Sequence, residues 1–279
     1  MDRILIKESV LICPRNDEES LMILKLAQKL GLPTVVSQQP HGAVLKREKK
    51  LLARIQEANP DAKRLVIVEL PGPEVEKELE DQGFEVVIID HHRYDGLDRM
   101  QEKSSLEQFM DLFGIGDDEL TAWGFDPKLV SAVGAIDRGF LWELKKEGIV
   151  GEEKKRVIEF YKSLTNELGI ERRQKEEAKA REAWEKREVR DGVTIVKSDE
   201  DLISIRDAVS FIVSEEFDEP QPVLILQGDR RMYLQDSDRA KALYDRFGGF
   251  TFGKDRCWGI LSEERKLPSV DEVLSIIVK

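Results

Sequence analysis

The stretch that most constrains the fold runs from Val86 to His92. Four β-branched apolar residues are followed there directly by Asp90, His91 and His92. Such a run is typical of a strand buried on both faces in a parallel sheet, and open α/β sheets bind ligands just beyond the carboxyl ends of such strands. Carboxylate and neutral imidazole suit Mn²⁺, Fe²⁺, Co²⁺ or Zn²⁺, which makes this a candidate metal site. The alternative is an aspartate that caps the next turn beside two solvated histidines.

The first part of the chain, up to about residue 150, alternates short apolar runs with amphipathic runs. This alternation is typical of βαβ units and predicts an α/β fold with a parallel sheet. The predicted strands lie at about 8–13, 34–37, 64–69 and 85–90.

Two predicted helices bear on the site. Asn16 and Glu19 resemble a capping box, so we expect a helix over 17–30 to start directly off the first strand. A second helix is expected from Pro127 toward Trp142, and it carries Asp137.

The rest of the chain changes character twice. Residues 151–190 are dominated by mixed-sign charge, which predicts an exposed helical connector. From 191 to 279 the apolar runs return in the order βαββαβα, the size of a small domain. We therefore expect a parallel-sheet domain over 1–150, the connector, and a smaller mixed-sheet α/β domain over 191–279.

Composition limits the classes of partner and compartment. The formal net charge of −12 argues against long nucleic acid as the ligand. Cys13 and Cys257 are too few for a disulfide framework, no leader is evident, and no stretch approaches the length of a membrane span. The cytoplasm is the expected location, and the sequence leaves the oligomeric state open.

The segment IIDHHRYDG, residues 88–96, resembles the signature of the DHH phosphoesterase superfamily. That superfamily includes manganese pyrophosphatases, RecJ-type exonucleases, nanoRNases and cyclic-dinucleotide phosphodiesterases. The resemblance implies a two-domain enzyme whose first domain binds metal through four motifs. Its second domain would bind substrate through a glycine-rich turn.

The resemblance also implies a ligand set, and the first motif departs from it. The matching stretch LICPRND has Leu11 in place of a histidine and Arg15 in place of an aspartate, and keeps only Asp17. Glu69 and Asp137 match the second and fourth motifs best. We therefore expect one Mn²⁺, or another divalent cation. Its expected ligands are Asp17, Glu69, Asp90, His91 and Asp137.

Two further roles follow from the resemblance. Arg15 would hold a phosphate near the position of the lost ligands, and His92 would orient the phosphoryl group or protonate the leaving oxygen. In the second domain, Gly248 and Gly249 would let backbone amides face an anion, with Lys254 or Arg256 as phosphate contacts.

Each candidate also has a structural explanation. Asp17 could serve the helix dipole, Glu69 could close a strand before a turn, Arg15 could pair with either, and Asp137 could pair with Arg138. The glycine pair could be a helix C-cap, and His41 is expected in an exposed loop rather than as a replacement ligand.

Two functions remain open at this stage. The first is a metal-dependent phosphoesterase acting on a phosphorylated small molecule, nucleotide or short oligonucleotide. The second is a non-catalytic nucleotide- or nucleic-acid-binding module with the same fold, which the missing ligands would favour.

Overall fold

A computed structural model of the chain describes residues 3–40, 42–168, 170–199, 203–217, 219–262 and 266–278. His41, expected in a loop, lies outside the described residues. The chain forms two compact units with interleaved segments. The first unit comprises Met1–His91, Gln101–Asp137 and Val150–Thr165, and the second comprises His92–Met100, Arg138–Ile149 and Asn166–Lys279. The connector predicted over 151–190 is therefore divided between the two units.

The first unit is built on a parallel sheet with the strand order β2-β1-β3-β4. Its strands lie within one or two residues of the predicted ranges, because each is a short apolar run between turn signals. The strands are β1 (Ser9–Pro14), β2 (Thr34–Ser37), β3 (Arg64–Val68) and β4 (Glu85–Ile89); the helices are α1 (Arg3–Lys7), α2 (Glu18–Leu30), η1 (Leu45–Arg47), α3 (Leu51–Ala58), α4 (Pro73–Asp81), α5 (Ser105–Phe113), α6 (Asp117–Ala122), the first part of α7 (Pro127–Lys146) and α8 (Gly151–Leu164).

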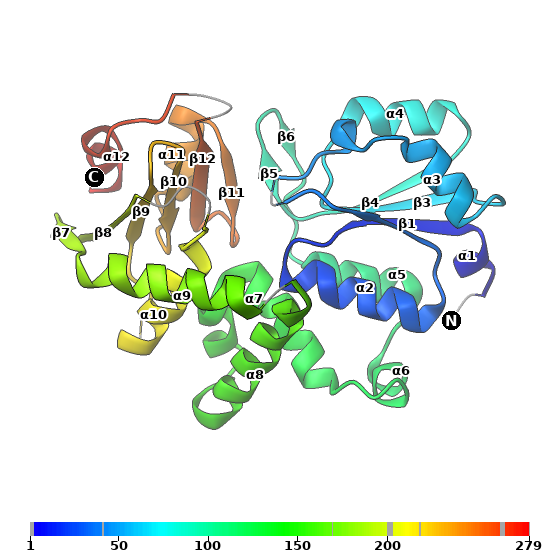
Figure 1. Cartoon of the computed structure of the whole chain (residues 1–279), viewed down its shortest axis with the longest axis horizontal. Coiled ribbons are helices and arrows are strands. Elements are labelled where there is room, and N and C mark those ends of the chain that lie inside the picture. Colours follow the sequence, from blue (N-terminus) through cyan, green and yellow to red (C-terminus); the bar gives the residue numbers. More distant parts are fainter. Residues whose placement is uncertain are drawn as a thin grey trace. The chain divides into compact units, whose positions relative to one another are not determined.

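Strand β1 shows why helices cover both faces of this sheet. Its side chains alternate, so Leu11 and Cys13 pack against α2 and α5, whereas Val10 and Ile12 pack against α3 and α4. Figure 1 shows α2 and α5 on one side of the sheet and α3 and α4 on the other. All four strands are parallel, so their carboxyl ends lie at one edge.

The second unit contains a mixed sheet with the order β6-β5-β11-β12-β10-β9-β8-β7. Helices α9 and α10 cover one face, and α11 and α12 cover the other. The strands are β5 (Arg93–Tyr94), β6 (Leu97–Asp98), β7 (Glu188–Arg190), β8 (Val193–Ser198), β9 (Val223–Gln227), β10 (Arg231–Gln235), β11 (Phe250–Phe252) and β12 (Cys257–Leu261); the helices are the end of α7, η2 (Thr165–Leu168), α9 (Ile170–Glu185), α10 (Arg206–Glu216), α11 (Ala240–Phe247) and α12 (Val270–Ile277).

The expected fold class, α/β with a parallel and a mixed sheet, is confirmed. The second sheet is nevertheless the larger one, because it recruits strands that the pattern did not predict. The hairpin β5–β6 directly follows the His91-His92 pair and joins the sheet where Arg93 pairs with Thr251 of β11. Two-residue strands carry no periodicity, so only long-range pairing reveals them.

Two local features differ from the predicted helices. Asp17, not Asn16, is the N-cap of α2: its side chain accepts from the amide of Ser20, whose hydroxyl is the reciprocal partner. Glu19 is therefore not a capping residue. Helix α7 is interrupted by non-helical backbone at Gly139 and Phe140, directly after Asp137 and Arg138. Within the described ranges, no helix has the length and apolar character needed to cross a membrane.

Candidate metal centre

Four residues of the first unit converge at the carboxyl edge of the parallel sheet. Glu19 lies in the first turn of α2 and Glu69 directly follows β3. His91 lies two residues after the end of β4, and Asp137 lies in the last turn before the interruption of α7. One potential ligand atom from each residue lies within 4.8 Å of the others. The group is therefore assembled from four separate chain segments, three of which start at strand ends.

The imidazole of His91 is at the centre of the group. Its Nε2 lies 2.5 Å from Oδ2 of Asp137, 3.4 Å from Oε1 of Glu69 and 4.0 Å from Oε2 of Glu19. Only 5% of the His91 side chain and 2% of the Glu19 side chain are exposed. One ring nitrogen thus faces three carboxylates at a position that water reaches poorly.

Burial and crowding of like charge perturb the titration of these groups. Burial raises the pKa of the Glu19 carboxyl well above its ordinary value, and the charges of Asp137 and Glu69 raise it further. Burial opposes the charged form of His91, but Asp137, Glu69 and Glu19 more than offset this and hold its pKa well above the ordinary value. The single positive charge of a protonated His91 therefore balances only part of the negative charge of the three carboxylates.

The N-terminus of α5 orients two of the carboxylates. The hydroxyl of Ser105 donates to Oε1 of Glu69 at 2.7 Å, and the amide of Leu106 donates to Oε1 of Glu19 at 2.8 Å. Ser104 caps this helix in a capping box with Glu107. These contacts fix the carboxylates in the way that outer contacts fix metal ligands.

The backbone of Glu69 is held in an unfavourable conformation. Its φ of 47° lies in the left-handed region, which costs a residue with a β-carbon about 1–2 kcal/mol. Such strain concentrates at functional sites, where the surrounding structure maintains it.

The group fits a divalent cation. Oε2 of Glu19 is buried and accepts no hydrogen bond from the described residues, while the other oxygen of this carboxylate is bonded to α5. An oxygen in this situation has given up water without receiving a donor, which is costly unless the carboxyl is protonated or a cation is bound. Three carboxylates and one imidazole form a donor set suited to Mn²⁺ and similar ions. Glu19, Glu69, His91 and Asp137 could together hold one such ion.

The predicted ligand set overlaps this group only in part. Glu69, His91 and Asp137 are brought together; Asp17 and Asp90 lie outside the group as the described residues define it. Asp17 caps α2 through its side chain, and Asp90 is buried at the end of β4, where its carbonyl accepts from Gln101 and Gln108.

Glu19 is the ligand candidate that sequence reasoning missed. Its position three residues after Asn16 suggested a capping box, which would direct the side chain back to the backbone. The N-cap is Asp17, one residue later. The side chain of Glu19 therefore points into the core, and only 1% of the residue is exposed. The sequence did contain one signal for this role: Glu19 lies next to the apolar residues that α2 buries, and an acidic residue is rarely buried without a partner.

Arg15 and His92 are not members of the four-residue group, although a ring nitrogen of His92 lies within 4.8 Å of ligand atoms of Glu69 and His91. Arg15 is exposed at the carboxyl end of β1, before α2 begins. His92 belongs to the second unit and opens the β5–β6 hairpin, where its carbonyl accepts from the amide of Arg99 at 3.1 Å.

The glycine turn of the second unit has a packing role. Gly249 has φ of 93°, and a Cβ there would lie 2.2 Å from the carbonyl oxygen of Gly259 in β12. The carbonyl of Gly248 accepts from the indole of Trp258 at 2.8 Å. The close approach to β12 of the turn between α11 and β11 therefore requires glycine at this point.

The two cations predicted for this turn are both in ion pairs. Lys254 contacts Glu143 of α7 at 2.7 Å, and Arg256 contacts Asp238. A phosphate would have to compete with these carboxylates for either cation.

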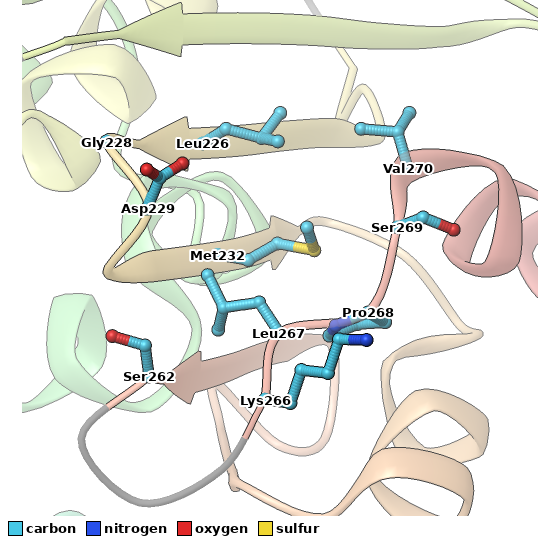
Figure 2. Close-up of a pocket in the computed structure, with 10 residues that line it drawn as sticks. All are labelled: Leu226, Gly228, Asp229, Met232, Ser262, Lys266, Leu267, Pro268, Ser269 and Val270. Atoms are coloured by element: carbon cyan, nitrogen blue, oxygen red, sulfur yellow. The ribbon is translucent and has the colours of Figure 1, made fainter.

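A cavity of about 460 Å³ lies elsewhere on the second unit (Figure 2). Its walls come from β9, β10 and the chain leading into α12, with the apolar side chains of Leu226, Met232 and Leu267 among them. None of the predicted site residues lines it. The cavity and the candidate metal centre therefore have no residue in common.

Comparisons with known proteins return structures but no sequence family. No protein-family model and no curated protein matches the chain. A manganese-bound exonuclease RecJ is similar over 91% of this chain and 85% of its own, with a TM-score of 0.42 and 14% identity. The pGpG-specific phosphodiesterase PggH from Vibrio cholerae is similar over 97% of each chain, with a TM-score of 0.44 and 12% identity.

A third structure, a protein from Helicobacter pylori G27, is similar over 97% of this chain and 98% of its own, with a TM-score of 0.25 and 8% identity. All three TM-scores are below 0.5, so these similarities assign no function to the chain. The resemblance of the chain to the DHH phosphoesterases therefore rests on its sequence signature at residues 88–96.

Proposed function

We propose that this chain is a divalent-metal-dependent phosphoesterase with Glu19, Glu69, His91 and Asp137 as the ligands of one Mn²⁺ or similar ion. The observation that carries this proposal is the single His91 nitrogen faced by three carboxylates from separate segments in a buried position. A purely structural cluster would need fewer negative charges to satisfy one imidazole. The substrate would be a phosphorylated small molecule, nucleotide or short oligonucleotide.

The bound ion would polarise a phosphoryl oxygen and make its water a stronger nucleophile near neutral pH. The chain's own residues prepare that chemistry. Ser105 and Leu106 hold Glu69 and Glu19 in fixed orientations, so little reorganisation accompanies metal binding. Arg15, exposed at the same sheet edge, would bind phosphate oxygens. We assign His92 the role of donor to the leaving oxygen, which its adjacency to His91 supports.

A non-catalytic binding module is the second candidate. The ion pairs of Lys254 and Arg256 favour it, because a phosphate at the predicted substrate turn would have to displace a carboxylate from either cation.

One experiment separates the two functions. Protein purified without chelator is analysed for bound metal and assayed with Mn²⁺ on bis(p-nitrophenyl) phosphate and a linear dinucleotide. We expect turnover in the wild type, loss of at least about 100-fold in Asp137→Asn, and normal turnover in Asp111→Asn, whose carboxylate lies on exposed α5 surface beside Lys103. Turnover that survives in Asp137→Asn would reject the metal-centre proposal. Metal and nucleotide binding without product would favour the binding module.

A further inference from the structure

The chain between β2 and α3 carries an unusual concentration of positive charge. Lys46, Arg47, Lys49 and Lys50 are all exposed, and among the described residues none of them contacts a carboxylate. Arg47 donates only to the carbonyl of Gly42, at 3.4 Å. We call residues 46–50 the basic loop.

Two exposed cations elsewhere in the first unit are held in ion pairs. Lys63 pairs with Glu8 at 2.5 Å, and Arg156 pairs with Asp126 at 2.7 Å. In a protein with a formal net charge of −12, carboxylates are abundant. The basic loop differs from these two positions because four cations adjoin one another there and none contacts a carboxylate of the described residues.

The single acid of the basic loop, Glu48, is directed inward. Only 4% of its side chain is exposed, and it accepts from the Ser37 hydroxyl, the Gln39 amide and Arg54, the last at 2.6 Å. Arg54 also donates to the carbonyl of Val36 at 2.6 Å. This network neutralises Glu48 internally and leaves the four cations to face solvent.

The basic loop is anchored beside the candidate metal centre. The amide of Leu45 donates to the carbonyl of Pro71 at 3.2 Å, and Pro71 follows Glu69 by two residues. A Cβ on Gly72 would lie 2.7 Å from the Cβ of Leu45, so the two segments are in close contact. Because β2 and β3 are parallel strands of one sheet, the segments that follow them emerge at the same edge.

We infer that the basic loop binds phosphates flanking the scissile one, so that the ligand is a short single-stranded oligonucleotide rather than a mononucleotide. The inference rests on the proposed function for the position of the scissile phosphate. Lysine and arginine neutralise successive phosphates of a flexible strand and release counterions, which makes binding depend on salt. A ligand with one phosphate would use the metal centre and leave the loop uncovered.

The test measures binding to a fluorescein-labelled five-nucleotide DNA strand in EDTA by fluorescence anisotropy at several salt concentrations. The test variant is Lys46→Gln/Lys49→Gln/Lys50→Gln. The control is Lys7→Gln/Lys29→Gln/Lys63→Gln, which changes the net charge equally. Its cations are exposed and lie next to the start of β1, the end of α2 and the start of β3, at the opposite edge of the sheet.

We expect the test variant to bind at least about tenfold more weakly at 50 mM salt, with a slope of log affinity against log salt smaller by about 2. The control should stay within about twofold of the wild type. Affinity for thymidine 5′-monophosphate, measured with Mn²⁺ in place of EDTA so that the metal centre is occupied, should be the same in all three proteins.

Equal weakening in both triple variants would mean that overall charge alone is responsible, and would overturn the inference. Equal weakening for the mononucleotide would overturn it too, because the loop would then grip the only phosphate present. Binding of anionic vesicles without binding of the DNA strand would have the same consequence. Metal analysis of the test variant separates this failure from that of the proposed function, since the loop provides no ligand to the centre.

Discussion

The amide of Leu106 donates a 2.8 Å hydrogen bond to Oε1 of Glu19, a residue 87 positions away in the sequence. This bond ties the N-terminus of α5 to the first turn of α2. It leaves the second oxygen of Glu19 directed toward His91, at 4.0 Å from Nε2. An acid that no family motif marks thereby becomes part of the candidate metal centre.

Glu19→Gln should weaken Mn²⁺ binding by at least about tenfold while leaving the fold intact, because glutamine keeps the acceptor for Leu106 and removes the charge. Isothermal titration with Mn²⁺ measures this. Without metal, the variant should unfold at higher temperature than the wild type at pH 7, because burial and neighbouring carboxylates raise the pKa of Glu19 and disfavour its charged form.

The matched control is Glu18→Gln, one residue earlier, where the side chain lies within reach of Thr165 rather than of the cluster. It should bind Mn²⁺ as the wild type does. Equal loss of affinity in both variants would show that the net charge of α2, not ligation by Glu19, sets the affinity.

Gly134→Ala should weaken the centre without touching a ligand. A Cβ at this position of α7 would lie 2.6 Å from Oγ of Ser104, the cap of α5, and would displace the helix end that orients Glu19 and Glu69. We expect Mn²⁺ affinity to fall about 10-fold or more, measured by titration. Ser131→Ala, on the exposed side of the same helix, is the control. Unchanged Mn²⁺ affinity in Gly134→Ala would show that the N-terminus of α5 does not determine the orientation of Glu19 and Glu69.

Gly249→Ala should destabilise the second unit by about 3 kcal/mol, because it adds the strain of a positive φ to a clash with the Gly259 carbonyl. Gly96→Ala isolates the first cause: its φ is 72°, and nothing lies within 4 Å of the added Cβ. Its cost should be about 1–2 kcal/mol. Urea unfolding measures both, and similar losses in the two variants would contradict the packing role of the glycine turn.

The carboxyl of Asp236 gives the second unit a predicted pH dependence. Burial raises its pKa from 3.8 to about 6, although the Trp142 indole donates to it at 3.0 Å and Arg256 is near. Between about pH 4 and 6 the folded chain holds the proton that the unfolded chain has lost. Stability from this group is therefore complete below about pH 4 and is lost as the pH rises to 6, a difference of up to about 3 kcal/mol.

Asp236→Asn should remove this dependence. Asparagine accepts from Trp142 and tolerates the left-handed backbone at this position, where φ is 57°. Relative to wild type, the variant should gain stability from pH 4 to pH 7, as followed by urea unfolding at each pH. The exposed Asp229→Asn is the control. A constant difference between Asp236→Asn and wild type across that range would contradict the raised pKa.

The strands of the parallel sheet were predictable because each is a continuous apolar run that a sheet covered on both faces can bury. The acidic and imidazole groups at the ends of β3 and β4 were predictable for the same reason, since parallel strands bring their carboxyl ends to one edge. The hairpin β5–β6 and strand β11 were not, because strands of two or three residues are defined by their pairing partners alone.

By itself, the amino-acid sequence determined the α/β class, the positions of β1 to β4, and the arrival of Glu69 and His91 at a common sheet edge. These follow from hydrophobic periodicity, which is local. The tertiary structure alone decided that Glu19 joins them and that Asp17 caps a helix instead. A shift of one residue in the cap rotates α2 by about 100°, and only the packing of α2 on β1 and α5 selects which side chain faces the core.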